Sequence, residues 1–247
     1  VEMNEERKEE NKVVEQIKIP KIVPILPLRE MVVFPHIIIP LVIGRERSLK
    51  LIDDSLNGDK IIGLFAQKSS NIEEPGQNDL FSVGTLGIID KMLKFPDGTT
   101  RVLVKGVSRI KTLECVSTDP YLKAKIVPLE EKFEKTVEVE GYLRNLVDLF
   151  QKIGQIAPYL PEEIVVTAMN IPEADKLSDF IASNMNISLQ EKQELLETLD
   201  VGLRLKKLTT FLTRELEILE LGKKIQSDMK TEMSKREREY FLREQLK

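Results

Sequence analysis

The chain contains one cysteine, one histidine and no tryptophan among its 247 residues. A single cysteine cannot form an internal disulfide bond, which fits a reducing compartment. His36 and Cys115 cannot by themselves supply the three or four nitrogen and sulfur ligands of a zinc site. The phosphate-binding pattern G-x-x-x-x-G-K followed by serine or threonine is also missing. We therefore expect these residues to contain no catalytic residue, no metal or nucleotide site and no cofactor.

Long hydrophobic runs are missing too. The most apolar stretch, Pro24 to Arg47, is cut by Pro27, Pro35 and Pro40, so it falls short of the about 20 continuous apolar residues that span a bilayer. Val1 to Lys12 is charged and lacks the apolar segment of a signal peptide. We therefore expect a cytoplasmic protein with no membrane partner.

Neither sign of charge dominates, since 41 acidic residues face 37 basic ones and the net charge is −4. Such a balance gives no global attraction to nucleic acid or to anionic membranes. The charge is unevenly placed, with a net +2 over residues 20–130 and −8 over residues 131–200. The hydrophobic periodicity changes near the same point. We predict a disordered charged segment (1–19), a β-rich subdomain (20–130), a helical subdomain (131–200) and a long helix (201–247).

Prolines prevent a helix at the start of the β-rich subdomain, which predicts short buried strands over Met31 to Phe34 and Ile37 to Ile43. A short helix is expected over Arg47 to Asn57 with Ser48 as its cap, followed by a strand over Lys60 to Ala66.

A long β-hairpin is predicted over Val83 to Lys105, with Pro96-Asp97-Gly98 as its turn. Val107 to Val116 and Tyr121 to Leu129 are expected to add two more strands. Together these elements predict a compact, mostly antiparallel β domain.

Beyond residue 130 the period becomes helical. Val137 to Ile153 carries an apolar stripe, Pro161 and Pro172 stand where helices begin, and Ser188 with Glu191 has the spacing of a capping box. From residue 200 no proline interrupts the pattern, so we expect one long helix whose apolar stripe fades after residue 222. Because the chain stops inside this pattern, we interpret it as a fragment of a longer protein. The predicted class is α+β.

The end of the predicted hairpin is the strongest candidate for a binding site. Met92, Leu93 and Phe95, next to Pro96, put apolar side chains on both faces of a strand that should alternate if one face met water. Two interpretations remain open: the residues contact a neighbouring element as core, or they form an exposed patch that grips unfolded polypeptide.

Other chemistry-bearing residues are expected to be structural or solvated. His36 stands beside a turn, and Cys115 lies in an alternating segment with no histidine near it in sequence, so a nucleophile and base pair would need folding to bring them together. The acidic pairs Glu73-Glu74 and Glu162-Glu163 fall in a loop and at a helix start, where carboxylates are usually solvated.

Four segments in one order carry a resemblance to a known family. They are ILPLREMVVFP with the following VGRERS, NDLFSVGTLG, KFPDGTTRVLVKG and EREYFLREQLK. This order resembles the amino-terminal domain of the Lon family of ATP-dependent proteases, of the bacterial type.

The resemblance implies a non-catalytic region that recognises unfolded or damaged polypeptides and delivers them to an AAA+ ring. It implies that the parent protein is a homohexameric endopeptidase that uses ATP and magnesium and carries a serine-lysine dyad in other domains of the same chain. The rival hypothesis is an RNA- or DNA-binding β-barrel module, because basic residues outnumber acidic ones over residues 91–125. Stacking aromatics are sparse there, only Phe95 and Tyr121, which disfavours nucleic acid as a partner.

Overall fold

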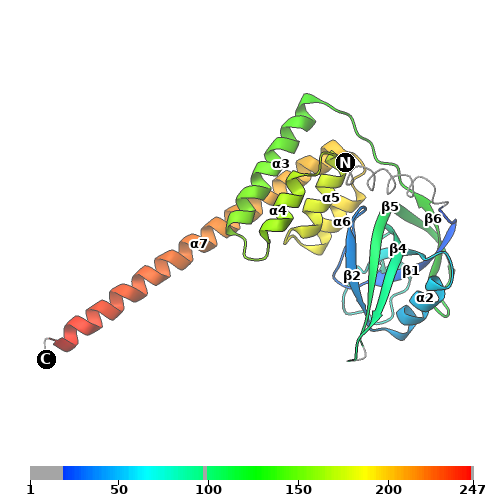
Figure 1. Cartoon of the computed structure of the whole chain (residues 1–247), viewed down its shortest axis with the longest axis horizontal. Helices are drawn as coiled ribbons and strands as arrows, with labels where there is room; N and C mark the ends of the chain where they lie inside the picture. Colours follow the sequence, from blue (N-terminus) through cyan, green and yellow to red (C-terminus); the bar gives the residue numbers. More distant parts are fainter. Residues whose placement is uncertain (1–18, 97–98, 246–247) are drawn as a thin grey trace, which may run out of the picture.

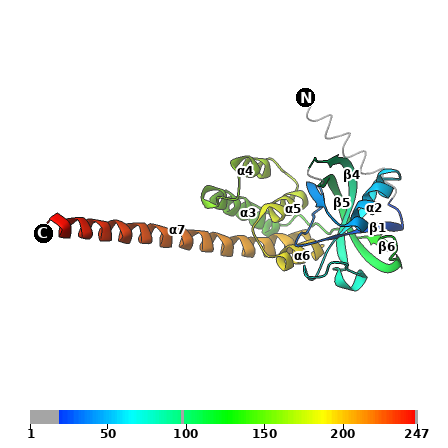
Figure 2. The same ribbon diagram turned by 90° about the horizontal axis from the view of Figure 1, so that it is seen from below.

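The computed structural model describes residues 19–96 and 99–245, with side chains up to residue 236. A β part and a helical part lie side by side, and one long helix projects away from them (Figures 1 and 2). The strands are β1 (Ile22–Leu28), β2 (Ile38–Ile43), β3 (Ile61–Ala66), β4 (Val83–Lys94), β5 (Thr100–Ser117) and β6 (Lys123–Pro128). The helices are α2 (Glu46–Leu56), η1 (Gln77–Asp79), α3 (Val137–Ile156), α4 (Glu162–Met169), α5 (Ala174–Asn184), α6 (Leu189–Glu197) and α7 (Val201–Gln245). The predicted α+β class is confirmed.

The strands form one sheet in the order β2-β5-β4-β3-β1-β6, and β6 also pairs with β5. The extra pairing closes β5, β4, β3, β1 and β6 into a barrel, because the long β5 pairs with β2 along its first half and with β6 along its second. Every pairing is antiparallel except that of β1 with β3. Among the strands that the structure describes, β2 alone has a single neighbour.

The first strand differs from the prediction. Val32 to Phe34 is buried and Met31 is partly buried, but the segment is irregular, and the residues before it form β1 instead, with Pro24 and Pro27 inside the strand. Proline fits a strand where the ladder does not need its missing amide. The sequence argument treated each proline as a break and so missed this strand. The predicted strand over Ile37 to Ile43 is confirmed as β2.

The two strands of the predicted hairpin are confirmed as β4 and β5, and two residues of its predicted turn, Asp97 and Gly98, lie outside the described residues. The strand expected over Val107 to Val116 is not a separate element. It continues the second arm of the hairpin, so β5 runs without a break through Gly106. A Cβ atom on Gly106 would lie 2.3 Å from the carbonyl oxygen of Phe34. Glycine therefore lets the chain at Phe34 pass directly over β5, and it marks a close crossing of backbones rather than a strand end.

The expected cap of α2 is also wrong. The helix begins at Glu46, with Arg45 as its N-cap residue and no side chain capping it, and Ser48 is buried in the first turn. The remaining predictions for this part hold: the helix stops at Asn57, and the predicted last strand is β6.

The helical part follows the sequence pattern closely. The apolar stripe of α3 is buried, and its innermost residues are Leu146, Leu149, Phe150 and Ile153. Pro161 is the N-cap residue of α4, and Ser188 caps α6 in a reciprocal capping box with Glu191. The capping box satisfies amides that a helix start leaves without hydrogen-bond partners, and proline has no amide hydrogen to satisfy at that position.

The long helix α7 has two halves of different character. Leu205, Leu208 and Leu212 are fully buried against the helical part, mainly against α3. Beyond them the apolar residues Ile218, Leu221, Ile225, Met229 and Met233 are exposed. Figure 2 shows this second half extending away from the rest of the molecule. The predicted fading of the stripe is therefore confirmed, although the apolar pattern continues on an exposed face.

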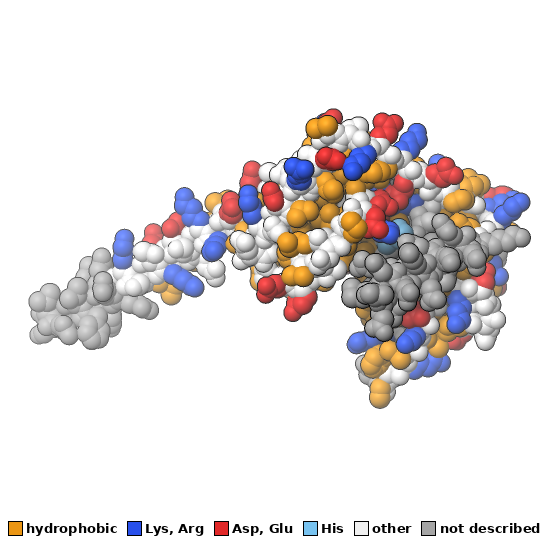
Figure 3. All heavy atoms as spheres, turned by 45° about the horizontal axis from the view of Figure 1, so that its top comes forward, with side chains coloured by type: hydrophobic (Ala, Val, Ile, Leu, Met, Phe, Trp, Pro, Cys, Tyr) orange, Lys and Arg blue, Asp and Glu red, His pale blue; other side chains and the backbone are white. Residues whose placement is uncertain are grey.

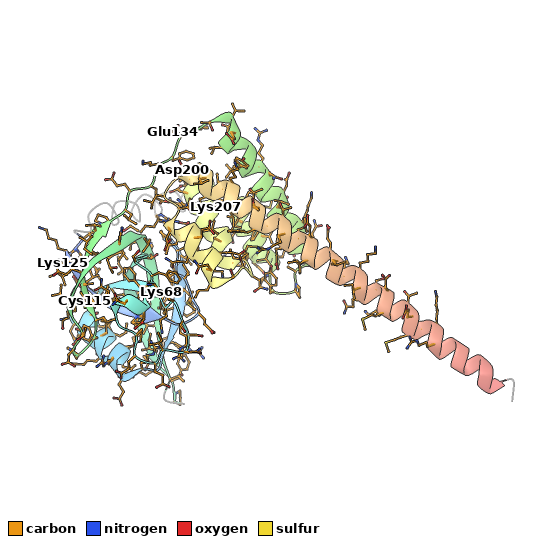
Figure 4. The ribbon with its side chains drawn as sticks, turned by 180° about the vertical axis from the view of Figure 1, so that it is seen from behind. Lys68, Cys115, Lys125, Glu134, Asp200 and Lys207 are labelled. Carbon is orange, nitrogen blue, oxygen red and sulfur yellow. The ribbon has the colours of Figure 1, made fainter. Side chains whose placement is uncertain are left out.

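The two parts share a hydrophobic core. Val32, Phe34, Ala66 and Val83 of the β part belong to the same buried cluster as the helical stripe. The connecting segment is tied to the start of α7, because the amide of Lys132 donates to Leu199 and the amide of Val201 donates to Lys132. Figure 4 shows this region, with Glu134 in the connection and Asp200 and Lys207 near the start of α7.

The predicted division at residues 130 and 200 stays a prediction, because a core that crosses the boundary is equally compatible with one folding unit. The predicted disordered segment 1–19 lies outside the described residues except for Ile19, which packs partly against the barrel core.

Candidate functional site

The predicted site lies at the free end of the β4–β5 hairpin. Leu93 is 57% exposed, Phe95 is 36% exposed and Pro96 is exposed as well. Met92 points the other way and packs partly against the barrel core. Each of the two interpretations left open by the sequence therefore applies to some of the residues. Met92 packs partly against the core, whereas Leu93, Phe95 and Pro96 are exposed at the surface.

Leu93 belongs to a wider apolar face that extends onto β2. Ile38 is 56% exposed and Val42 is 66% exposed, and Pro40 between them is exposed too. In the sheet register Val42 lies opposite Arg101 of β5, which in turn lies opposite Leu93. We call Ile38, Pro40, Val42, Leu93 and Phe95 the apolar face. Figure 3 shows hydrophobic side chains exposed at the end of the β part that carries the hairpin.

Basic side chains border the apolar face. Lys91, Lys94, Arg101 and Lys105 lie on one stretch of β4 and β5, and Asp90 is the one acidic residue among the described residues 90–96 and 99–105. The guanidinium of Arg101 stacks on the ring of Phe95, 4.5 Å from its centroid. This contact fixes one aromatic side chain at the border of the face.

A cleft of about 870 Å³ runs along the other side of β2. Its apolar walls come from β2 and from the end of β1, and they include Leu28, Met31, Leu41 and Ile43. Its mouth is polar, and carries Arg29, Arg45, Glu46, Arg47, Glu73 and Glu74. Arg47 and Glu74 form an exposed ion pair of 3.8 Å. The cleft and the apolar face meet along β2, because Pro40 and Val42 belong to the apolar face and also line the cleft.

Arg45 organises the mouth of the cleft. It donates to the side-chain oxygen of Gln67 at 2.8 Å and approaches the carbonyl oxygen of Ile72 at 3.5 Å. Burial lowers its pKa, and the neighbouring Arg29 lowers it further. These two cations lie together, and Glu73 partly offsets them.

The other candidates have structural roles. His36 occupies a turn with φ of 62°, and its amide donates to Gly106 at 3.0 Å. Cys115 lies on the opposite half of β5, beside β6, and its thiol donates to the carbonyl oxygen of Ser117 (Figure 4). Folding does not bring the two together as nucleophile and base. Glu162 and Glu163 form the first turn of α4, as expected.

In the part of the chain that the structure describes, no group of three or more His, Cys, Asp or Glu side chains could hold a metal ion. None of the helices in the described ranges is long and apolar enough to cross a membrane.

Sequence reasoning named the hairpin end as a candidate site but did not include the exposed apolar residues that β2 contributes beside it. Ile38, Pro40 and Val42 alternate with the buried residues of that strand, so a period of two was visible. The proline-rich context led us to expect a buried strand. The missed signal was that a proline within a strand favours an edge.

Comparison with known proteins agrees with this architecture. The family model described as ATP-dependent protease La (LON) substrate-binding domain matches residues 22–214. Lon protease of Dictyoglomus thermophilum is 53% identical over 93% of this chain, and Lon protease of Desulfosudis oleivorans is 42% identical over 93%. The matches span 29% and 28% of those two relatives.

A solved structure described as the N-terminal domain of Mycobacterium avium complex Lon protease has the same fold. Its TM-score is 0.62 at 20% identity, and the match covers 78% of this chain and 98% of that one. The Lon N-terminal domain protein from Xanthomonas campestris gives a TM-score of 0.58 at 18% identity, over 77% and 98%. The chain therefore belongs to the family of Lon proteases and contains the substrate-binding domain of that family.

Proposed function

We propose that this chain is the non-catalytic recognition region of an ATP-dependent protease and that its β part captures unfolded or damaged polypeptides. The observation that supports this role is the apolar face, which exposes Ile38, Val42 and Leu93 on neighbouring strands of one sheet. Single exposed apolar residues are normal, but several that gather on neighbouring strands around basic side chains such as Arg101 are typical of an interaction surface.

The energetics suit weak and promiscuous capture. Burying roughly 200 Å² of apolar surface at about 25 cal/mol per Å² gives about 5 kcal/mol before the cost of ordering the captured chain. An unfolded polypeptide exposes leucine, valine and phenylalanine side chains that could supply this surface. A folded protein buries them, so the face would discriminate by folding state.

The rest of the machinery belongs to the longer protein in this proposal. Relatives that this chain matches over less than a third of their length are named Lon protease. We therefore place the AAA+ ATPase with its ATP and magnesium, and the protease domain with its serine-lysine dyad, in that remaining length. A cytoplasmic homohexamer, with α7 as the link to the ATPase ring, completes the proposal.

The nucleic-acid alternative is not favoured. Of the two aromatics that it needs, the ring of Phe95 is stacked under Arg101, while Tyr121 is buried with its hydroxyl donating to Asp54 at 3.1 Å. Burial removes Tyr121 as a stacking partner for a base, which leaves Phe95 as the single exposed ring of the two.

A binding assay with a permanently unfolded model protein tests the role. The chain should bind that protein and not its native form, and the double variant Leu93→Ser, Phe95→Ser should bind at least tenfold more weakly. The matched control is Leu113→Ser, Val116→Ser, which removes from the far half of β5 two apolar side chains that are at least as exposed. Equal loss in both variants, or no binding by the unaltered chain, would contradict the proposal.

A further inference from the structure

Among the strands that the structure describes, none pairs with the outer edge of β2. The amide of Gly106 donates to Ile37, which sets the alternation of the β2–β5 ladder. Since the register is regular from Ile38 to Ile43, the residues bonded to β5 are Ile39, Leu41 and Ile43. The amides and carbonyls of Ile38, Pro40 and Val42 consequently point away from the sheet, toward the cleft side.

We infer that this edge binds an extended polypeptide segment as an additional antiparallel strand, and that the preferred segment alternates acidic with apolar residues. The inference rests on the proposed function and assigns a binding mode and a substrate class to it. An exposed strand edge is a template for pairing, and main-chain hydrogen bonds supply affinity without demanding a sequence. Antiparallel pairing is the geometry that β2 already makes with β5.

The direction of the side chains fixes the alternation. Residues directly opposite each other in an antiparallel pair share one face of the sheet. Segment residues opposite Ile38, Pro40 and Val42 would therefore lie on the outer face, and those between them would point inward. The inward set meets the cleft walls, including Leu41 and Ile43, and should be apolar.

Charge complementarity determines which side chains are preferred at the segment positions that face outward. Arg101 and Lys105 lie on the outer face of β5, one strand from β2 and two strand spacings, about 10 Å, from an added strand. That separation is close to the Debye length at physiological salt, so their attraction for outward carboxylates is only partly screened. Four basic residues and one acidic residue on this stretch favour glutamate or aspartate over lysine there.

Pro40 reduces the number of hydrogen bonds that the edge of β2 can make, but it does not prevent pairing. Ile38, Pro40 and Val42 each present a backbone carbonyl at this edge, and Ile38 and Val42 also present an amide, which Pro40 lacks. Five backbone groups are therefore available to pair with an added strand. A proline at this position hinders two copies of β2 from pairing with each other. The edge can then take a transient segment while avoiding permanent self-association.

Synthetic peptides test the inference on the unaltered chain. A peptide that alternates valine with glutamate should bind more tightly than a valine and lysine alternation, and more tightly than a block arrangement of the same valines and glutamates. High salt should narrow the gap between the two alternating peptides, because their difference is electrostatic.

Backbone methylation provides the sharper readout. In the added strand the glutamate amides face β2, while the valine amides face solvent. N-methylation at a glutamate removes a hydrogen bond and should weaken binding about tenfold, or about 1.4 kcal/mol. N-methylation at a valine should leave binding unchanged.

The outcomes separate this inference from the proposed function. If the methylated peptides all bind alike, or if the alternating peptide does not bind while the unfolded protein does, strand addition at β2 is wrong and capture by the apolar face stands. If the unfolded protein does not bind either, both fail. The variant Pro40→Val, which restores the sixth group, should bind the valine and glutamate peptide more tightly, and unchanged or weaker binding would contradict strand addition.

Discussion

Arg109 of β5 and Asp179 of α5 form a two-pronged ion pair at the junction of the β and helical parts. The two nitrogens of the guanidinium fork lie 2.8 Å and 2.6 Å from the two carboxylate oxygens, and both side chains are fully buried. Arg204 of α7 donates to the same carboxylate at 2.8 Å, and Glu131 of the connecting segment contacts both arginines. Burial alone would lower the pKa of Arg109, but Asp179 outweighs it and the pKa is raised. The network joins three elements that are distant in sequence.

Asp179→Asn should destabilise the chain severely. The substitution leaves two buried guanidinium groups with Glu131 as their remaining carboxylate, and removing one partner of a buried ionic network costs roughly 3–5 kcal/mol. Denaturant unfolding measures the loss. The exposed pair Lys125 and Glu114 is the control, at the same 2.8 Å separation, and Glu114→Gln should scarcely move the unfolding midpoint. A small effect of Asp179→Asn would show that the junction is not held by this network.

Gly106→Ala should also destabilise the chain, by about 2 kcal/mol or more, because the new Cβ would lie 2.3 Å from the carbonyl oxygen of Phe34 and backbone must move. Gly44→Ala is the matched control, since nothing lies within 4 Å of its Cβ position. Thermal melting of both variants checks this. Equal melting temperatures would mean that the chain crossing at Phe34 relaxes freely.

These two variants mark what the sequence could and could not predict. The helices, the cap of α6 and the strands of the hairpin follow local pattern, as Ser188 with Glu191 illustrates, because their hydrogen bonds close within a few residues. Arg109 and Asp179 are 70 residues apart, and each reads as an ordinary surface charge until the fold brings them together. Gly106 likewise has no local signature, since its constraint comes from Phe34. The hairpin end could be named as a candidate because apolar residues occupy both faces of its strand. The exposed apolar residues that β2 adds beside it could not be predicted, because their position depends on the order of the strands in the sheet.

Acid should remove the stability that the ion pair between Glu191 of α6 and Arg214 of α7 contributes. The two side chains lie 2.6 Å apart. The hydrogen bond from Arg214 lowers the pKa of Glu191 from 4.5 to about 2, with help from Ser188. A lowered carboxylate pKa stabilises the fold above the unfolded-state value and loses that contribution as pH falls from about 4.5 through about 2. Glu191→Gln keeps the capping box and removes the charge. The variant should melt below the unaltered chain at pH 7 and level with it near pH 2. A gap that persists at pH 2 would assign the effect to the cap.

Amide exchange should divide α7 near Gly222. Leu205, Leu208 and Leu212 are fully buried, so the first half can open only with the helical part, whereas the exposed second half can fray by itself. Hydrogen exchange of the isolated chain at low concentration should show slow amides up to about residue 219 and fast ones beyond it. Protection that extends along the second half and rises with concentration would indicate self-association through the exposed face of Ile218, Leu221, Ile225, Met229 and Met233.

The residues at the hairpin end should separate stability from binding. Met92 packs against the barrel core, so Met92→Ser should lower the unfolding free energy by about 1–2 kcal/mol, in line with partial burial of its side chain. Leu93→Ser removes a side chain that is 57% exposed, and should leave stability within about 0.5 kcal/mol. In binding to an unfolded protein the order reverses, and Leu93→Ser should cause the larger loss. Replacing Met92, Leu93 and Phe95 together would merge the two effects, so each variant is measured alone by denaturant unfolding and by binding. If Met92→Ser weakens binding while Leu93→Ser does not, the substrate meets the inner side of the hairpin, and the apolar face is the wrong surface.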